Sequence, residues 1–413
     1  MRGNIVQCAL RDTGLLPKVL TVPATGHLRE IPALTARAAS ALALLALLVP
    51  AMSLQAQTTA ADPAPAAAAA PATATNPASS AGASQVLNDT ATWLAGLALD
   101  TNPSVSQAQR ETDEAWAALR RSRLEPMEAF AAKHFAAERK NCATLFYPFG
   151  GPDMLNALGF FPNCQRYVLF GLEPVGELPV LAKLDDEQKA LVLADMHKAQ
   201  QYILRRNFFV TQYMSEDLNT PHLKGILPIV TTTLVRMGYV ILDIVAANVD
   251  GSTPPTAGRH PRAVFVHFQA RSGGPVQELV YASFDASDTG LEKNPLPLHL
   301  LEPLAPTATL LKAASYLLHD TSFARMRSLV AAKSPLLIQD DSGMPYAALL
   351  ADGYSVELYG NYVSTIPAFS YRFQKDLAQA YATQPVHARL AFPWSYAWKR
   401  AEASLQIARK TGS

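Results

Sequence analysis

The stretch LFYPFGGPDMLNALGFFPNCQRYVLFGLEP, residues 145–174, constrains the fold more than any other part of the chain. An apolar run ends in a Gly-Gly-Pro turn, a short segment with helical spacing follows over residues 152–160, and a second apolar run, RYVLFGL, comes next. Short apolar runs bounded by turn residues are typical of buried strands. Two strands joined through a helix pair in parallel by default. The stretch therefore predicts a parallel strand–helix–strand unit.

Two cysteines test this geometry. Cys142 directly precedes the first predicted strand, and Cys164 stands almost directly before the second. If these strands are parallel neighbours, both cysteines lie at the same end of the sheet, within the Cα separation that a disulfide tolerates. A disulfide between Cys142 and Cys164 is therefore predicted, and two unpaired buried thiols are the alternative.

The N-terminal region has the features of an export signal. Arg29 and Arg37 precede the apolar run AASALALLALLVPAMSL, residues 38–54, and small residues follow. A basic segment, a short apolar core and a small-residue exit are the marks of a secretory signal peptide. The uninterrupted core is shorter than the about 20 residues that a membrane-spanning helix needs. We expect residues 1–56 to form the signal peptide region and the protein to be exported to the periplasm or beyond. An uncleaved signal segment is the alternative, and it is the only membrane link that we expect.

The rest of the chain divides into a linker and one domain. Residues 57–85 are almost entirely Ala, Pro, Thr and Ser, so they offer little to bury and are predicted to be a disordered linker. Residues 86–413 are predicted to be a single α/β domain, with a mixed β-sheet flanked by helices. Further strands are expected at residues 239–249, 263–270, 276–285, 335–339 and 355–360, the first three antiparallel. Helices are expected at residues 104–140, 185–207, 223–237, 307–319, 322–333, 367–383 and 396–409.

Acidic residues fall at the ends of predicted strands or in turns. In open α/β sheets ligands bind beyond the carboxyl ends of the strands, so these carboxylates are the candidate catalytic residues. They are Asp153, Glu173, Asp285, Asp288, Asp340 and Asp341. Paired carboxylates can divide acid and base roles or hold a divalent cation, and the candidate metal ligands are Asp285, Asp288, Asp340 and Asp341. The alternative is that these residues form turns and cap helices, because Asp-Ser-Gly and Asp-Thr-Gly are turn formers.

Several functional classes find no support. The chain has no G-x-S-x-G or H-E-x-x-H motif and no zinc-ligand spacing. Its formal net charge is +1, without a Lys/Arg cluster, so nothing predicts a nucleic-acid partner. The turn at residues 150–152 and Glu173 also fit a Rossmann-like nucleotide-binding unit, but G-x-G-x-x-G is missing and Pro152 lacks a donor N–H.

Aromatic residues gather near turns in the C-terminal part: Tyr346, Tyr354, Tyr359, Tyr362, Trp394, Tyr396 and Trp398. Aromatic faces with carboxylates are how proteins hold sugars and peptides, although such rings also fill cores. We therefore expect an exported ligand-binding or envelope-associated module, with an envelope glycan or peptide as ligand. The first alternative is a carboxylate- or metal-dependent hydrolase of such ligands, and the second is a nucleotide-binding domain. Whether the protein is an enzyme stays open.

The runs GGPDMLNALGFFPN and YVLFGLEPVG, together with LLIQDDSGMPY and VELYGNY, resemble a family of exported bacterial proteins without an assigned activity. The resemblance covers most of the predicted domain. It implies export and a single domain, and it implies no catalytic residues.

Overall fold

The strand–helix–strand unit predicted at residues 145–174 is present. In the computed structural model, which describes residues 77–208, 216–255, 257–396 and 403–411, β1 (Thr144–Tyr147) is followed by α6 (Met154–Phe160) and β2 (Arg166–Gly171). β1 and β2 pair in parallel, with Leu145 opposite Tyr167. Asp153 caps α6 by accepting a hydrogen bond from the Asn156 backbone N–H at 3.1 Å. The parallel geometry expected from the sequence is confirmed.

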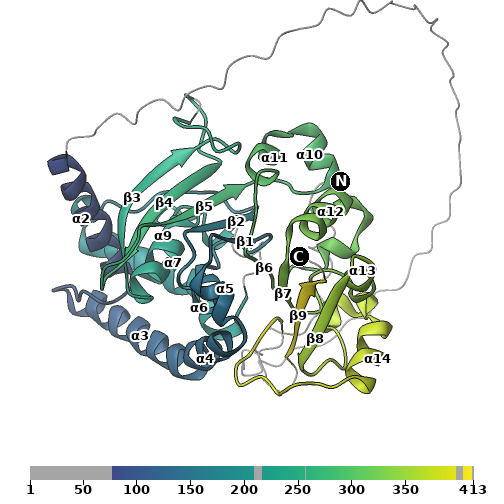
Figure 1. Ribbon diagram of the computed structural model, residues 1–413. Coiled ribbons are helices and arrows are strands. Elements are labelled where there is room, and N and C mark those ends of the chain that lie inside the picture. Colours follow the sequence, from purple (N-terminus) through teal and green to yellow (C-terminus); the bar gives the residue numbers. More distant parts are fainter. Residues whose placement is uncertain (1–76, 209–215, 256, 397–402, 412–413) are drawn as a thin grey trace, which may run out of the picture. The chain divides into compact units, whose positions relative to one another are not determined.

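The described strands form one nine-stranded mixed sheet in the order β3-β4-β5-β2-β1-β6-β7-β9-β8 (Figure 1). Five central strands, β5, β2, β1, β6 and β7, run parallel, and antiparallel pairs flank them on both sides. The remaining bounds are β3 (Tyr239–Ala247), β4 (Ala263–Ala270), β5 (Gln277–Ser283), β6 (Ala308–Leu311), β7 (Leu336–Gln339), β8 (Tyr354–Gly360) and β9 (Ser404–Lys410). The predicted α/β class and the antiparallel pairing of the segments at 239–249, 263–270 and 276–285 are confirmed.

Helices cover both faces of the sheet because strand side chains alternate between faces. Leu145 and Tyr147 of β1 join the core beneath the first group of helices, whereas Phe146 joins the core on the opposite face. The first group is α2 (Pro77–Leu94), α3 (Pro103–Leu119), α4 (Glu125–His134), α6, α7 (Asp186–Gln201) and α9 (Leu227–Arg236). The opposite face carries α10 (Asp288–Lys293), α11 (Leu296–Leu301), α12 (Ala324–Lys333) and α13 (Tyr346–Ala351). α14 (Lys375–Thr383) packs beside β8 in a small third cluster. Strands buried on both faces are why the central segments are almost continuously apolar.

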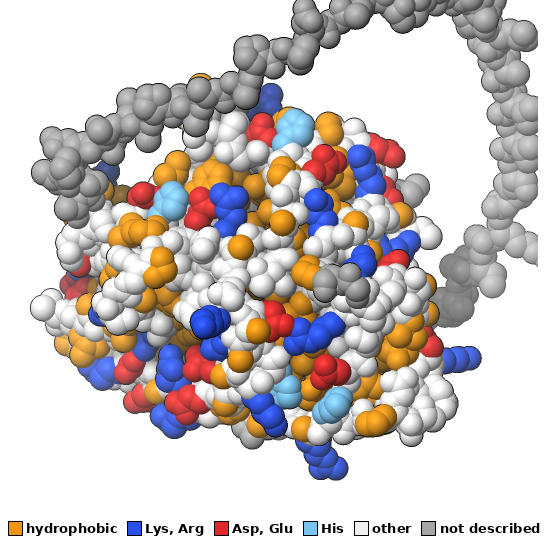
Figure 2. Space-filling model, viewed as in Figure 1, with side chains coloured by type: hydrophobic (Ala, Val, Ile, Leu, Met, Phe, Trp, Pro, Cys, Tyr) orange, Lys and Arg blue, Asp and Glu red, His pale blue; other side chains and the backbone are white. Residues whose placement is uncertain are grey.

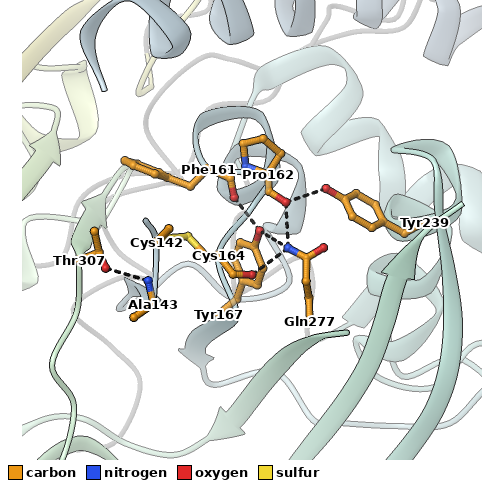
Figure 3. Close-up of a disulfide and its surroundings, with 9 residues drawn as sticks. All are labelled: Cys142, Ala143, Phe161, Pro162, Cys164, Tyr167, Tyr239, Gln277 and Thr307. Carbon is orange, nitrogen blue, oxygen red and sulfur yellow. Dashed lines mark hydrogen bonds between the residues drawn. A yellow bond between two sulfur atoms is a disulfide. The ribbon is translucent and has the colours of Figure 1, made fainter. Parts of the chain in front are cut away.

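A disulfide joins Cys142 and Cys164, with a Cα–Cα distance of 4.4 Å, as the parallel pairing predicted. Both cysteines are buried at the amino ends of β1 and β2. Gln277 of β5 fixes the loop beside the bond: its side-chain amide donates to the carbonyl oxygens of Pro162 and Cys164, each at 2.8 Å (Figure 3). The disulfide and this amide together tie the parallel strands at one end.

Helical segments expected at residues 104–140, 185–207 and 322–333 are also present. The first comprises α3, a π-helical turn at Arg120–Leu124, α4 and the short α5 (Ala136–Lys140). Asp185 caps α7 as expected: its carboxylate accepts from the Gln188 N–H at 2.8 Å while the Gln188 side chain accepts from the Asp185 N–H.

Two predicted helices are wrong. Residues 307–319 contain the central strand β6 and then a 3₁₀ turn at Leu317–His319. The helical-looking spacing of Leu310, Leu311 and Ala314 arises because a strand buried on both faces is apolar at every position. Within 396–409, the described residues from Ser404 on form β9, between β7 and β8. Its helix-forming residues pair as a strand because hydrogen-bonding partners lie on both sides, and this context overrides propensity.

Three boundaries also differ. α9 begins at Leu227 rather than 223, with Pro228 in its first turn. The helix expected over 367–383 is a 3₁₀ segment, Pro367–Arg372, followed by α14. The domain starts before residue 86, because α2 begins at Pro77.

α2 belongs to the domain because it covers an edge of the sheet. Asn88 exchanges hydrogen bonds with the backbone of Ile241 on edge strand β3, and Ser84 also donates to the Ile241 carbonyl. These polar side chains satisfy backbone groups that an edge strand otherwise exposes. The C-terminal part of the segment expected to be a linker is therefore helical and docked.

The predicted signal region at residues 1–56 and the linker up to residue 76 lie outside the described residues. In the part of the chain that the structure does describe, no helix is long and apolar enough to cross a membrane. On the face shown in Figure 2, basic and acidic side chains are interspersed, in keeping with the nearly balanced charge of the chain.

Candidate functional site

The sheet has a topological switch point between β1 and β6. From β1 the chain passes through α6, on one face of the sheet, to β2. From β6 it passes through α12, on the opposite face, to β7, which lies on the side of β6 away from β1. Ligands of open α/β sheets bind beyond the carboxyl ends of the strands at such a point. The segments that follow β1, β6 and β7 therefore define the candidate site.

Backbone conformations that are costly for residues with a side chain gather in these segments. Ala313, Ser315 and Tyr316, directly after β6, have φ values of 51°, 53° and 55°. Phe149, after β1, and Ser395, in the loop before β9, are also left-handed, with φ values of 61° and 65°. Such conformations cost about 1–3 kcal/mol each and persist only where the surroundings impose them, which is common at functional sites.

Side chains from other loops hold the segment after β6 in this shape. Three consecutive backbone N–H groups donate to them: Ala313 to Asp340 Oδ2 at 2.7 Å, Ala314 to Ser342 Oγ at 2.7 Å and Ser315 to Tyr396 Oη at 2.8 Å. The Tyr396 hydroxyl in turn donates to the Ala313 carbonyl at 2.9 Å. The loops after β6 and β7 and the loop before β9 thus form one hydrogen-bonded unit.

Asp340, fully buried after β7, has donors at both carboxylate oxygens. Oδ1 accepts from the backbone N–H and the hydroxyl of Ser342, at 2.7 and 2.5 Å, and Oδ2 accepts from Ala313. This is the turn-forming role that the Asp-Ser-Gly sequence allows. Asp340 therefore joins two loops, with donors at both of its carboxylate oxygens.

Asp341, the next residue, points elsewhere. Its carboxylate accepts hydrogen bonds from the hydroxyls of Tyr316 and Ser404. Burial, and then the neighbouring charge of Asp340, raise the pKa of Asp341 to about 7. At neutral pH this carboxyl group therefore exchanges between its neutral and its ionised form.

A cavity of about 30 Å³ adjoins Asp341. We call it the tyrosine cavity, and its lining residues are Tyr316, Asp341, Tyr362, Ser364, Thr365, Ile366, Ser395, Tyr396 and Ser404. Tyr316 and Tyr362 are buried, whereas Ser364 is exposed and Thr365 and Ile366 are partly exposed, so the cavity meets the surface along residues 364–366. Of its lining residues, Asp341 alone carries a charge near neutral pH, and that charge is negative.

A buried charge cluster lies beneath the switch point. The Lys312 Nζ, at the end of β6, is 3.7 Å from Asp153 Oδ2 and donates to the Asn207 carbonyl. Asp153 also accepts from the Tyr147 hydroxyl at 2.9 Å, and it faces the buried Arg123 guanidinium. Burial lowers the pKa of Lys312 to about 8 and that of Arg123 to about 9, while Asp153 opposes both shifts. This cluster secures the carboxyl ends of β1 and β6, and its groups do not line the tyrosine cavity.

Glu173, after β2, is buried too. The Tyr281 hydroxyl of β5 donates to the Glu173 backbone carbonyl at 2.8 Å and lies 3.4 Å from its carboxylate. An added Cβ on Gly171 would stand 2.3 Å from the Glu173 carboxylate, so glycine is what allows this approach. Each of three buried acids (Asp153, Glu173 and Asp341) thus has a tyrosine hydroxyl as partner, which is how buried polar groups are satisfied.

Asp285 and Asp288 do not join these acids. Asp285 accepts from the Ser287 N–H, and Asp288 accepts from the N–H groups of Ala324 and Arg325 at the start of α12. These are the turn and capping roles that the sequence left open. Across the described residues, no three His, Cys, Asp or Glu side chains are grouped so that they could hold a metal ion.

The turn after β1 differs from a phosphate-binding loop. The start of α6 is closed by the buried Asp153 carboxylate, and Glu173 lies against Gly151 and Gly171. Two carboxylates at the place where a phosphate would approach a helix N-terminus oppose anion binding. This geometry does not favour the nucleotide hypothesis.

Sequence reasoning missed Lys312 and Tyr316, because their segment was expected to be helical. Tyr362 and Tyr396 were within the aromatic grouping already noted, and Trp398 of that grouping lies outside the described residues.

Comparison of the sequence with protein-family models and with curated proteins finds no match. The fold and the site define the protein as a mixed-sheet α/β protein with a polar, tyrosine-lined cavity at the carboxyl edge of its parallel strands.

Proposed function

We propose that the protein is an exported ligand-binding module, and that its tyrosine cavity receives a terminal polar group of an envelope glycan or peptide. The observation that carries the proposal is the tyrosine cavity. It combines a buried carboxylate, aromatic rings and hydroxyl groups at the edge of the sheet where α/β proteins bind ligands.

Export is supported by the signal-like sequence at residues 1–56 and by the disulfide, since such bonds persist in oxidising compartments. The measurement that tests export is the N-terminal sequence of the mature protein together with its thiol count. Export predicts cleavage near residues 53–56 and no free thiol in the mature chain. An intact N-terminus and three reduced thiols, those of Cys8, Cys142 and Cys164, in protein from the cytoplasm would contradict it.

A hydrolase remains the alternative because of one observation: a carboxyl group with a pKa of about 7, as in Asp341, suits a general acid. Two features favour binding instead. Asp340, the neighbouring carboxylate, has donors at both oxygens. The tyrosine cavity, at about 30 Å³, accepts the end of a ligand but not a sugar ring together with an attacking water.

The test uses soluble muropeptides and envelope oligosaccharides titrated into the mature protein by calorimetry. Substituting Ser364→Trp should block the cavity from its exposed side, and Ser370→Trp, on an exposed residue nearby, is the matched control. We expect binding to the wild type and to S370W, its loss in S364W, and recovery of the ligand unchanged. Binding that S364W leaves intact would move the site elsewhere, and a cleaved ligand would favour the hydrolase.

A further inference from the structure

We infer that the tyrosine cavity recognises a primary ammonium group at the end of an unbranched carbon chain, such as the side chain of a lysine-type residue in a peptide. This inference rests on the proposed function and names the chemical group that the cavity binds. It is carried by the charge of the lining, by the aromatic faces and by the size of the cavity.

The charge of the site favours a cation. Asp341 supplies a carboxylate, and the basic residues nearby already have partners outside the lining. Lys312 faces Asp153, and Arg372 pairs with Asp320 at 2.9 Å. His319, whose ring packs on Tyr316, stays neutral at physiological pH because burial lowers its pKa to about 4. An anion would find no positive partner among the lining residues, whereas an ammonium would find a carboxylate whose charge no cationic residue of the lining neutralises.

Aromatic faces supply the second element. The rings of Tyr316 and Tyr396 are nearly parallel, with an interplanar angle of 12° and centroids 6.5 Å apart, and Phe369 packs against both. The electron-rich face of such rings attracts a cation that has lost its water. Hydrogen bonds hold the two hydroxyls in place, from Tyr316 to Asp341 and from Tyr396 to Ala313, so the rings are fixed before any ligand binds. A preorganised site loses less conformational entropy on binding.

Size selects among cations. A cavity of about 30 Å³ holds a group about as large as one water molecule. A terminal ammonium fits this space, because it is compact and carries three N–H donors for carboxylate and hydroxyl oxygens. A trimethylammonium group has no N–H donor for these oxygens, and the ring of an amino sugar is bulkier than the end of an unbranched chain. The ligand must therefore present its amine on a slender chain that passes the partly exposed residues 364–366.

The ionisation of Asp341 supports this assignment. Titratable groups facing Asp341 are Asp340, Tyr316, Tyr362, Tyr381 and Tyr396. Burial raises the pKa of all four tyrosines above 10, so near neutral pH Asp341 changes its charge while they stay neutral. A bound ammonium favours the carboxylate, so affinity should rise as the pH passes from 6 to about 8.

The experiment measures binding of Nα-acetyl-lysine methylamide to the mature protein by calorimetry, with the Nε-acetylated analogue as neutral control. We expect the amine to bind, and the acetylated analogue, choline and glucosamine to bind at least about tenfold more weakly, a difference of about 1.4 kcal/mol. The variant D341N keeps the shape of the site and should lose about 30-fold in affinity, as expected when one member of a buried charge pair is removed. D352N, at an exposed residue, is the matched control.

The comparison of amine and acetylated analogue uses the wild type, so it stands even if D341N fails to fold. Equal binding of the two compounds, or equal binding of potassium ions, would overturn the inference. If the amine does not bind but an amine-free envelope fragment does, and S364W blocks that fragment, this inference fails while the proposed function stands. If no envelope compound binds, both fail.

Discussion

Replacing Asp153 by Asn tests whether the buried charge cluster stabilises the switch point. Asn keeps the size of the side chain and caps helices as well as Asp does, so the start of α6 should survive. What disappears is the negative charge 3.7 Å from Lys312 and facing Arg123. Removing one partner of a buried ion pair usually costs about 3–5 kcal/mol.

The size of the loss in stability depends on how readily Lys312 and Arg123 can give up their protons once Asp153 no longer carries a charge. The pKa of Lys312 is about 8, so at pH 7 the neutral amine lies only about 1 kcal/mol above the charged form. The same reasoning for Arg123, with a pKa of about 9, gives about 3 kcal/mol. The free energy of unfolding of D153N at pH 7 should therefore fall by about 1–4 kcal/mol.

The pH dependence distinguishes this reasoning from a simple loss of packing. The folded pKa of Lys312 lies below its unfolded value, so the protein's stability from this group rises as the pH passes from about 8 to 10.5. Above pH 8 the wild-type Lys312 is already largely neutral, so its ion pair with Asp153 contributes less to stability. The cost of D153N should therefore shrink between pH 7 and pH 9.

Urea denaturation followed by tryptophan fluorescence measures these values at each pH. D285N, at an exposed turn, is the control and should change stability by less than about 0.5 kcal/mol. The double variant D153N/K312M should lose less than D153N alone, because it leaves only Arg123 uncompensated. A cost for D153N that is constant from pH 6 to 9, or a loss well above about 5 kcal/mol, would refute the reasoning.

Two further perturbations probe the sheet. Replacing Cys142 and Cys164 together by Ser opens a disulfide with a sequence separation of 22 residues, and the free energy of unfolding should fall by about 3 kcal/mol; an unchanged denaturation midpoint would contradict this. Hydrogen bonds to Glu278 and then Asp243 raise the pKa of His267 to about 9, above its unfolded value of about 6.5. This contribution is complete below about pH 6.5 and is lost as the pH rises towards 9, so wild type should lose more stability over that window than H267Q. Because the imidazole is 31% exposed, the difference should be small, and NMR titration of the ring checks the pKa directly; a ring pKa near 6.5 would contradict it.

Local patterns were enough for part of the fold. The β1–α6–β2 unit and the pairing of Cys142 with Cys164 could be predicted because turn, helix and strands lie within 30 residues and constrain one another directly. The antiparallel strands β3, β4 and β5 could be predicted for the same reason, since turn residues separate apolar runs along the chain.

The sequence by itself also placed Asp340 and Asp341 at the end of a buried strand, but it did not determine what each carboxylate does. The neighbours Asp340 and Asp341 differ because one meets the backbone of Ala313, while the other meets the Tyr316 hydroxyl. Both partners come from the segment directly after β6. β6 itself has helical spacing in the sequence and forms a strand because parallel neighbours bury it on both faces. Which side chains converge beyond the carboxyl ends of the strands depends on strand order, and strand order is set by contacts between residues far apart in the chain. The sequence thus determined which residues could carry chemistry, and the tertiary structure decided which of them meet in one cavity.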